Sequence, residues 1–373
     1  MIKILHTGDI HLDSPFSGLD PRSAEIRKNE LRAAFTSMMT YAKMNNVDML
    51  LMAGDIFDSE YVSNETLILL RRELANFGKP VFITPGNHDP AIPGSVWKKD
   101  YFSDNVHVFN KPELSSFDLD DIGTTVYGFG FSSKNMTDVP IRGRSVSDPG
   151  RINILLCHCD MITNTLDNTC CPMTADDINS FGVDYAALGH IHNPPSGSAE
   201  EKWCYCGCLE PRGFDEPGPK GACLVEISKK DGKSDVLVKR VRFSKRRYEK
   251  GEVVLQEAET QSDVIDAVST YLTEHKFGED AIVSIKLKGT VSPALVINTA
   301  YVSRSISGVF SIRITDETNP ILDFDALDSD IGIKGEVYRQ LKSKLKSEDK
   351  HERELALRAL RYAFNALSGD KAF

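Results

Sequence analysis

The stretch Val81-Phe82-Ile83-Thr84-Pro85-Gly86-Asn87-His88-Asp89-Pro90 is the part of this chain that decides its fold. Its uninterrupted apolar run predicts a short buried strand. Gly86 allows a sharp turn where the strand ends, and Pro90 prevents a helix from following at once. The loop therefore presents an amide, an imidazole and a carboxylate at the end of a strand, which is where open α/β sheets bind ligands.

Apolar runs and helical stripes alternate around this stretch. Helices are predicted over residues 25–46 and, after an N-cap at Ser63, as far as Gly78. Strands are predicted at residues 2–7, 47–53, 81–84, 152–156 and 185–188. This alternation is typical of the α/β class. Three later runs, at residues 203–208, 221–227 and 235–243, alternate like strands and predict a second sheet packed on the first.

Five of the predicted strands end in residues that can bind metals or carry protons. They are Asp9 and His11, Asp55, Asn87 and His88, His158, and His190 and His192. Each of these taken alone has a plain structural explanation, such as a helix cap or a satisfied polar side chain. Their placement at five strand ends is hard to attribute to chance, and the Asp-x-His and His-x-His spacings aim both members of a pair the same way.

The chemistry of these side chains indicates a centre with two divalent metal ions. Imidazole, carboxylate and amide donors without thiolate suit manganese best, with iron or zinc as alternatives. Two such ions polarise a phosphoryl group and generate hydroxide at neutral pH. The sequence therefore predicts hydrolysis of phosphoesters.

Composition limits the other possibilities. The chain has 373 residues and a net charge of -10, which argues against a protein that coats nucleic acid by bulk electrostatics. No apolar run approaches the length of a membrane span, and the first residues run directly into a strand pattern, so a cytoplasmic protein without a membrane segment is expected. The eight cysteines are then expected to be mostly reduced thiols.

A family resemblance follows from motifs that occur in a fixed order. Asp9-x-His11, Gly54-Asp55-x-x-Asp58, Gly86-Asn87-His88-Asp89, His158 and Gly189-His190-x-His192 resemble the calcineurin-like metallophosphoesterase superfamily. The opening His6-Thr7-Gly8-Asp9-Ile10-His11-Leu12 and the segment from Gly207 to Phe214 resemble its SbcD-type DNA-repair exonucleases, in particular the YhaO-like branch. One departure concerns Asp13, where many SbcD-type enzymes have glycine, and it puts the shape of the substrate groove in doubt.

The resemblance implies a role for each residue of the site. Asp9, His11 and His192 would hold one metal, Asn87, His158 and His190 would hold the other, and Asp55 would bridge them. His88 would face the phosphate and act in catalysis rather than as a ligand. Asp89 would either orient His88 through a hydrogen bond or bond the backbone amides of its own turn.

The resemblance also implies an architecture. The superfamily match covers about residues 1–245, expected to form a four-layer α/β/β/α metallophosphoesterase sandwich. Residues 251–320 are expected to form a small α+β capping domain, and residues 327–373 a helical C-terminal segment that binds a partner. In this segment Val337, Leu341 and Leu345 form one apolar stripe, and Leu357, Leu360, Phe364 and Leu367 form a second.

The function expected on this basis is a metal-dependent DNA exonuclease and endonuclease that works in DNA repair with an SbcC-like coiled-coil ATPase. Related nucleases dimerise, so a homodimer is left open. One alternative is a phosphatase or small-molecule phosphodiesterase with the same metal site. Another is a catalytically silent regulatory subunit, against which the complete ligand set argues.

Two groups of residues have open explanations at this stage. The basic run formed by Lys239, Arg240, Arg242, Lys245, Arg246, Arg247 and Lys250 is either a solvated strand edge or a strip that contacts backbone phosphates. Cys157 and Cys159 flank His158 and are expected to pack in the core. Cys204, Cys206 and Cys208 share one strand face, and their alternation favours a half-buried strand over a metal site; the sequence assigns no function to them or to Cys170 and Cys171.

Overall fold

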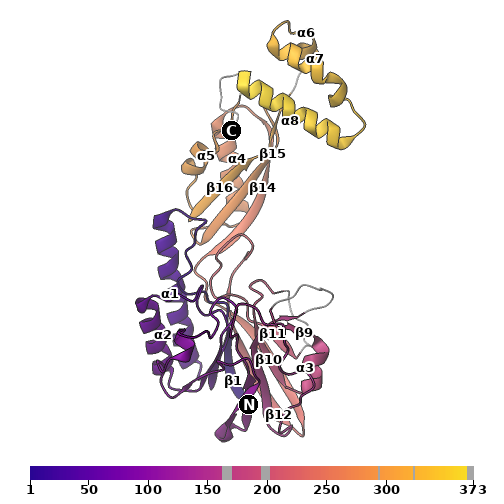
Figure 1. Ribbon diagram of the computed structural model, residues 1–373. Helices are drawn as coiled ribbons and strands as arrows, with labels where there is room; N and C mark the ends of the chain where they lie inside the picture. Colours follow the sequence, from indigo (N-terminus) through magenta and orange to yellow (C-terminus); the bar gives the residue numbers. More distant parts are fainter. Residues whose placement is uncertain (162–169, 195–201, 293–294, 322–323, 368–373) are drawn as a thin grey trace. The chain divides into compact units, whose positions relative to one another are not determined.

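The computed structural model describes residues 1–161, 170–194, 202–292, 295–321 and 324–367. The chain divides into two compact units, Met1–Arg247 and Tyr248–Phe373, and Figure 1 labels the helices and strands of both.

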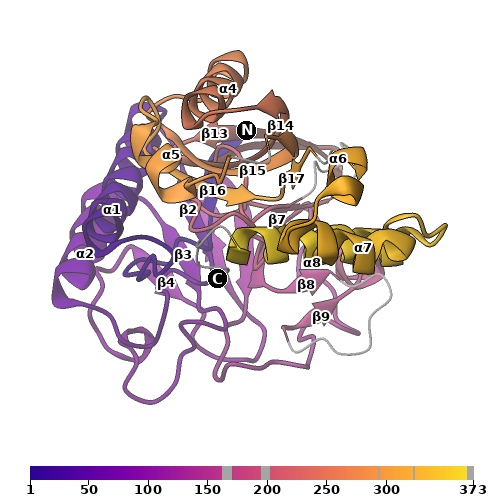
Figure 2. The same ribbon diagram turned by 90° about the horizontal axis from the view of Figure 1, so that it is seen from above.

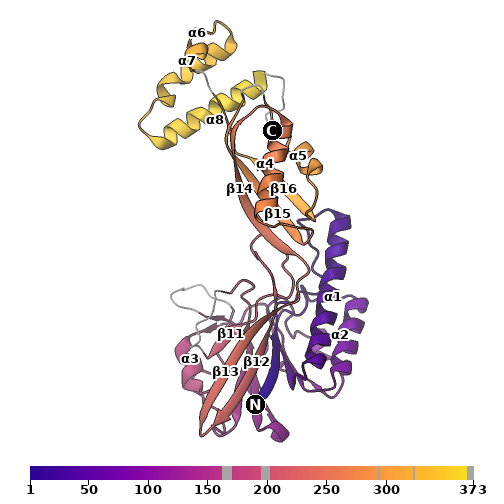
Figure 3. The same ribbon diagram turned by 180° about the vertical axis from the view of Figure 1, so that it is seen from behind.

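The first sheet of the first unit has six strands in the order β13-β12-β1-β2-β3-β4. Four neighbouring strands run parallel: β1 (Ile2–Thr7), β2 (Met49–Ala53), β3 (Val81–Thr84) and β4 (Val106–Val108). Two antiparallel strands, β12 (Gly221–Lys230) and β13 (Lys233–Arg242), complete the sheet. Figure 3 shows β12 and β13 as long paired strands.

The second sheet has five strands in the order β11-β10-β7-β6-β5. Its members are β5 (Ser115–Leu119), β6 (Thr124–Gly128), β7 (Ile152–His158), β10 (Tyr185–Gly189) and β11 (Trp203–Tyr205). Only β5 is antiparallel to its neighbour.

The predicted membership of the second sheet is therefore wrong in part. The second sheet exists, but β12 and β13 extend the first sheet through pairing of β12 with β1, and only β11 of the three predicted strands joins the second. Alternation of polar and apolar residues reveals that a strand has two faces, but it does not reveal which strand lies beside it.

The hydrophobic clusters show how the layers pack. Leu5 and Leu50 lie in a cluster with residues of the helices α1 (Pro21–Met44) and α2 (Asn64–Phe77). Ile4 and Leu51 face the other way, into a cluster shared with the second sheet. Leu155 of the second sheet packs with α3 (Ala175–Phe181). The unit is thus an α/β fold of two mixed sheets with flanking helices.

Capping residues explain where the two long helices begin and end. Asp20 accepts hydrogen bonds from the amides of Arg22 and Ser23, and Pro21 follows it, so α1 begins at Pro21 and earlier than predicted. Ser63 accepts from the amide of Thr66, which confirms the predicted N-cap of α2. Gly78 ends that helix at a φ of 70°, a value that favours glycine.

The second unit contains a small sheet with two helices. Its strands are β14 (Arg247–Ala258), which begins at the last residue of the first unit, β15 (Ala281–Val291), β16 (Ser311–Asp316) and β17 (Asn319–Pro320). The helices α4 (Gln261–Glu274) and α5 (Thr299–Ser305) contribute Val264, Val268 and Val302 to one cluster with the strands. Figure 2 shows α4 and α5 against this sheet.

Three further helices follow, α6 (Phe324–Ser329), α7 (Ile333–Leu345) and α8 (Lys350–Leu367). The two predicted apolar stripes meet: Leu345 of α7 packs in one cluster with Leu360 and Phe364 of α8. Much of the apolar surface that was predicted to bind a partner is therefore buried between α7 and α8.

Candidate metal centre

The site lies where five strands end. The loop after β1 carries Asp9 and His11, the loop after β2 carries Asp55, and the loop after β3 carries Asn87 and His88. His158 is the last residue of β7, and His190 and His192 directly follow β10. Strands from both sheets thus deliver the residues predicted for the site to one place.

A first group consists of Asp9, His11, Asp55 and His192, whose ligand atoms all lie within 4.8 Å of one another. The Nε2 atoms of His11 and His192 face each other at 3.2 Å. His192 Nε2 lies 3.7 Å from Asp9 Oδ1. Two imidazoles and two carboxylates converging in this way form a donor set that fits a divalent cation.

A second group is built around His158. Its Nε2 lies 2.9 Å from Asn87 Oδ1, and its Nδ1 lies 3.0 Å from the carbonyl oxygen of Ala53. A hydrogen bond from Nδ1–H to that carbonyl leaves the Nε2 lone pair available for a metal. His190 and Cys170 complete this group, with ligand atoms within 4.8 Å of one another and of His158.

Asp55 lies between the two groups. Its Oδ2 is 3.7 Å from His11 Nε2 of the first group and 3.5 Å from His158 Nε2 of the second. The side chain is almost completely buried. A carboxylate in this position can reach an ion on either side, so the structure offers a His/Asp metal site of the kind typical of dimetal phosphoesterases.

The backbone at these residues adopts uncommon conformations. Asp9, His11 and Asp55 have φ values of 45°, 51° and 49°, and His190 has a φ of 109°. Such values are infrequent for residues with a side chain and cluster at functional sites. Backbone hydrogen bonds join the first two loops, from the amide of Asp9 to Gly54 O and from the amide of His11 to Asp55 O, and the amide of His190 donates to the Asp9 carboxylate.

Burial and neighbouring charges shift the pKa values of the site residues. It lowers the pKa of His11 well below its ordinary value and lowers that of His190 to about 4. Burial also raises the pKa of Asp9 to about 6, against the attraction of His192 and His158. For Asp55, burial acts upward, but His158, His11 and His88 together outweigh it and lower the pKa. Metals bind neutral imidazoles, and the lowered pKa values of His11 and His190 favour that form.

His88 occupies the exposed rim of the site. Its ring centre lies 4.8 Å from that of His11, and its Nδ1 lies 3.1 Å from the carbonyl oxygen of Asp58. Asp89, in contrast, is buried. Its carboxylate accepts hydrogen bonds from the amide of Gly86 in its own turn and from the amides of Ile56 and Phe57 in the loop after β2.

Sequence reasoning missed three charged residues that surround the first group. Glu216 Oε1 lies 2.7 Å from His192 Nδ1. Arg212 donates to Asp58 Oδ1 at 2.7 Å, and the same Asp58 oxygen lies 3.2 Å from His11 Nδ1. Arg212 and Asp58 belong to the motifs that carry the family resemblance, and Glu216 closely follows one of them. The family motifs were therefore the feature of the sequence that could have identified these three residues.

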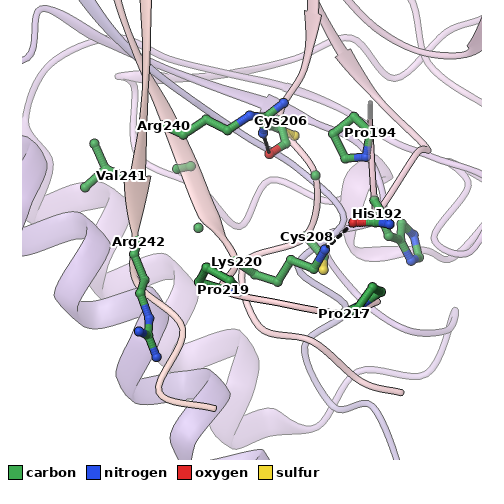
Figure 4. Close-up of a pocket in the computed structure, with 14 residues that line it drawn as sticks. His192, Pro194, Cys206, Cys208, Pro217, Pro219, Lys220, Arg240, Val241 and Arg242 are labelled. Carbon is green, nitrogen blue, oxygen red and sulfur yellow. Dashed lines mark hydrogen bonds between the residues drawn. The ribbon is translucent and has the colours of Figure 1, made fainter. Parts of the chain in front are cut away.

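A cavity of about 320 Å³ opens beside His192 (Figure 4). Lys220, Arg240 and Arg242 line it, and none of the described residues in its wall is acidic. Lys220 Nζ lies 2.8 Å from Asn193 Oδ1, and Arg240 donates to the carbonyl oxygens of Tyr205 and Cys206. The predicted basic run is thus divided, since Arg246 turns away from the cavity and pairs with Glu30.

The cysteines are placed in different surroundings. Cys157 and Cys159 are buried in the cluster of the second sheet, which confirms their predicted packing role. Cys204 lies 3.9 Å from Cys223, and Cys208 lies 3.5 Å from a carboxylate oxygen of Glu216. Among the residues that the structure describes, Cys204, Cys206 and Cys208 do not gather into a metal-binding group.

Comparison with known proteins agrees with this geometry. The model of the calcineurin-like phosphoesterase family matches residues 2–194. The Bacillus subtilis (strain 168) protein "Uncharacterized metallophosphoesterase YhaO" is 30% identical over 301 residues, which span 78% of this chain and 72% of that protein. The chain therefore belongs to the calcineurin-like metallophosphoesterase family, a family of phosphoester hydrolases, and the resemblance seen in the motifs is confirmed.

Two more distant relatives have names that refer to DNA repair or to a nuclease. The "DNA double-strand break repair protein Mre11" of Aeropyrum pernix is 26% identical over 61% of this chain and 58% of its own length. A subunit of the nuclease SbcCD from Staphylococcus epidermidis is 23% identical over 52% of this chain and 57% of its own length. This chain thus spans less than two thirds of either protein.

Within the described part of the chain, every helix is too short or too polar to cross a lipid bilayer.

Proposed function

We propose that this protein is a metal-dependent DNA nuclease that hydrolyses phosphodiester bonds. The observation that carries the hydrolytic part of the proposal is the position of Asp55 Oδ2 between His11 Nε2 and His158 Nε2, at 3.7 and 3.5 Å. Asp9, His11 and His192 would hold one divalent ion, Asn87, His158 and His190 the other, and Asp55 both. When bound, two such ions would polarise the phosphoryl group and activate water, with manganese the expected metal.

Side chains beside the metal ions would supply the charge stabilisation and the proton transfer. The exposed His88 would stabilise charge on the phosphoryl oxygens or give a proton to the leaving oxygen. Its Nδ1 faces the carbonyl of Asp58, so its Nε2 is the atom that would act toward substrate. Asp89 would support this loop through the three amides that it binds, and an orienting effect on His88 stays a prediction.

Two observations favour DNA over a small phosphoester. The relatives named above are called a nuclease and a DNA double-strand break repair protein. Lys220 and Arg240 line the cavity beside His192, and on this proposal they would contact a further backbone phosphate of the substrate. A substrate with a single phosphate would leave that second contact unused.

The same proposal extends to architecture and partners. The first unit would be the four-layer α/β/β/α catalytic domain, residues 251–320 the capping domain, and residues 327–373 the segment that binds an SbcC-like ATPase. The name of the Staphylococcus epidermidis relative presents it as one component of a complex. In this chain Ile331, Leu355 and Tyr362 remain exposed after α7 and α8 have packed together. They are the apolar residues that a partner would cover.

The direct test is manganese-dependent hydrolysis of an end-labelled linear duplex, run beside a chromogenic phosphodiester. The wild type should degrade both, and the His88→Ala variant should degrade neither at a comparable rate. His275→Ala, which removes an exposed imidazole from the second unit, is the control. Cleavage of the small ester alone, even with the ATPase present, would contradict the DNA assignment.

The partner assignment has its own test. The full chain, a Leu355→Asp and Tyr362→Asp double variant, and a chain shortened by residues 327–373 would be compared for binding to a coiled-coil ATPase of this type. Binding that survives in both altered chains would contradict a role for the helical segment.

A further inference from the structure

Cys170 lies against the second ligand group, a position that no motif of the sequence indicates. It is 6% exposed and lies just before the short strand β9 (Pro172–Met173). Its backbone forms an isolated parallel β-bridge with Met136. Its Sγ and one ring nitrogen each of His158 and His190 lie within 4.8 Å of one another. The same Sγ is 3.9 Å from Asn87 Oδ1, an oxygen that faces His158.

We propose that Cys170 is a thiolate ligand of the metal held by Asn87, His158 and His190, and that it makes this position selective for zinc over manganese. The inference rests on the proposed two-metal site and adds a donor that the motifs of the sequence do not contain. Binding would break the S–H bond of Cys170, form a sulfur–metal bond and release the proton to solvent.

The distances are those of a compact ligand group. Metal–nitrogen and metal–sulfur bonds of about 2.0 and 2.3 Å place two ligands of a tetrahedral ion about 3.5 Å apart. Ligand atoms that lie up to 4.8 Å apart would therefore draw together by at most about 1 Å when an ion binds. The 3.9 Å between Cys170 Sγ and Asn87 Oδ1 is already close to that separation.

The donor chemistry makes the two metal positions unequal. The first group of Asp9, His11, Asp55 and His192 offers only nitrogen and oxygen, whereas the second would add sulfur. Soft thiolate ligands favour zinc, while carboxylate and carbonyl oxygens suit manganese. A mixed centre, with zinc at the Cys170 position, is the expected consequence.

The neighbouring Cys171 provides a matched control. It is fully buried, has a φ of 45° and belongs to the hydrophobic cluster of the second sheet. Within the described chain it belongs to none of the groups of side chains able to hold a metal.

Cobalt(II) gives a readout that is independent of catalysis. Metal-free full-length protein would be titrated with cobalt(II), with bound cobalt counted by elemental analysis and the near-ultraviolet spectrum recorded for a thiolate-to-cobalt charge-transfer band. The wild type and Cys171→Ser should bind two ions and show the band. Cys170→Ser should bind cobalt but lose the band, and Cys170→Ala serves as a second variant if the serine variant does not fold by circular dichroism.

Competition between zinc and manganese tests the selectivity. Replacement of Cys170 should reduce the zinc preference of the second position by roughly 10-fold or more. Two bound cobalt ions without a charge-transfer band in the wild type would overturn the Cys170 proposal and leave the two-metal site intact. A wild type that binds fewer than two ions would overturn the metal site itself, and the Cys170 proposal with it.

Discussion

His192 Nδ1 lies 2.7 Å from Glu216 Oε1, so a ring predicted to bind metal is held from behind by a buried carboxylate. Burial tends to lower the pKa of His192, but the hydrogen bond to Glu216 and the charge of Asp9 outweigh it and raise that pKa. Burial acts in the opposite direction on Glu216, where the bond to His192 and the charge of Arg212 prevail and lower the pKa to about 2. Glu216 therefore stays ionised and directs Nε2 of His192 into the site.

Replacing Glu216 should weaken metal binding without removing a ligand. Glu216→Gln keeps the size of the side chain but removes the charge that orients the ring, and such supporting residues typically contribute about 10–100-fold to metal affinity. Manganese affinity measured by titration into metal-free protein should fall by that factor. Glu226→Gln, on β12 away from the site, should leave it unchanged. Equal affinity in wild type and Glu216→Gln would show that the ring needs no such support.

Gly86 is required because of its closeness to Asp55. A Cβ at this position would lie 2.6 Å from the Asp55 amide nitrogen and nearer still to Asp55 Oδ1. Gly86→Ala should therefore displace the shared carboxylate, and we expect loss of at least one bound metal ion in elemental analysis. Gly18→Ala is the control, because a Cβ there would meet no atom of another segment within 4 Å. A Gly86→Ala variant with full metal content would contradict the tight packing of these two loops.

The basic cavity should matter for DNA and not for a small ester. Arg240→Ala and Lys220→Ala each remove one cation beside His192, and removal of one phosphate contact should reduce the slope of log K against log salt by about 0.9 on duplex DNA. Filter binding to a duplex at several salt concentrations measures this slope, while chromogenic ester hydrolysis reports on the metal centre. Lys233→Ala, at the exposed start of β13, is the control. Slopes identical to the wild type would argue against a phosphate contact in the cavity.

Asp89 should contribute to stability through its three amide hydrogen bonds. Asp89→Asn replaces one carboxylate oxygen with an NH₂ group, which cannot accept a hydrogen bond from a backbone amide. A buried amide left without a partner costs about 1–3 kcal/mol. Urea unfolding should show a decrease of that size in the free energy of unfolding. If Asp89 instead acts mainly on His88, the pH profile of ester hydrolysis would move while stability stays constant.

His6 makes the metal-free protein sensitive to acid. Burial, aided by the charge of Arg240 and opposed by a hydrogen bond with the Leu188 backbone, lowers its pKa from 6.5 to about 3. The folded state thus keeps His6 neutral in a range where the unfolded chain binds a proton. The contribution to stability is complete above the ordinary pKa of 6.5 and is lost as the pH falls toward 3, by about 1.4 kcal/mol per pH unit.

The difference between two proteins isolates this effect from the other titrating groups. His6→Asn retains a polar group toward the Tyr185 hydroxyl, which lies 2.9 Å from His6 Nδ1, but cannot take up the proton. Urea unfolding in the presence of a chelator, between about pH 7 and pH 4, should give a shallower loss of stability in this variant. Parallel curves for wild type and variant would exclude His6 as a source of acid sensitivity.

The residues of the candidate site and the strands that carry them could be predicted from the amino-acid sequence alone. Apolar runs that end in Asp, Asn and His are local signals, and parallel strands bring their ends to one edge, so Asp9, Asp55 and His158 were identifiable without coordinates. The N-cap at Ser63 and the packing of Cys157 could be predicted for the same reason, because each depends on its nearest neighbours in the chain.

The surroundings of those residues depend on the tertiary structure. Glu216 supports His192 and Cys170 joins His158 through contacts that no periodicity in the sequence encodes. The order of the strands in the sheets also depends on tertiary contacts, because β12 pairs with β1 although the two strands lie near opposite ends of the first unit's sequence. Burial, which produces the shifted pKa values of His11 and His6, likewise arises only when the layers close over them.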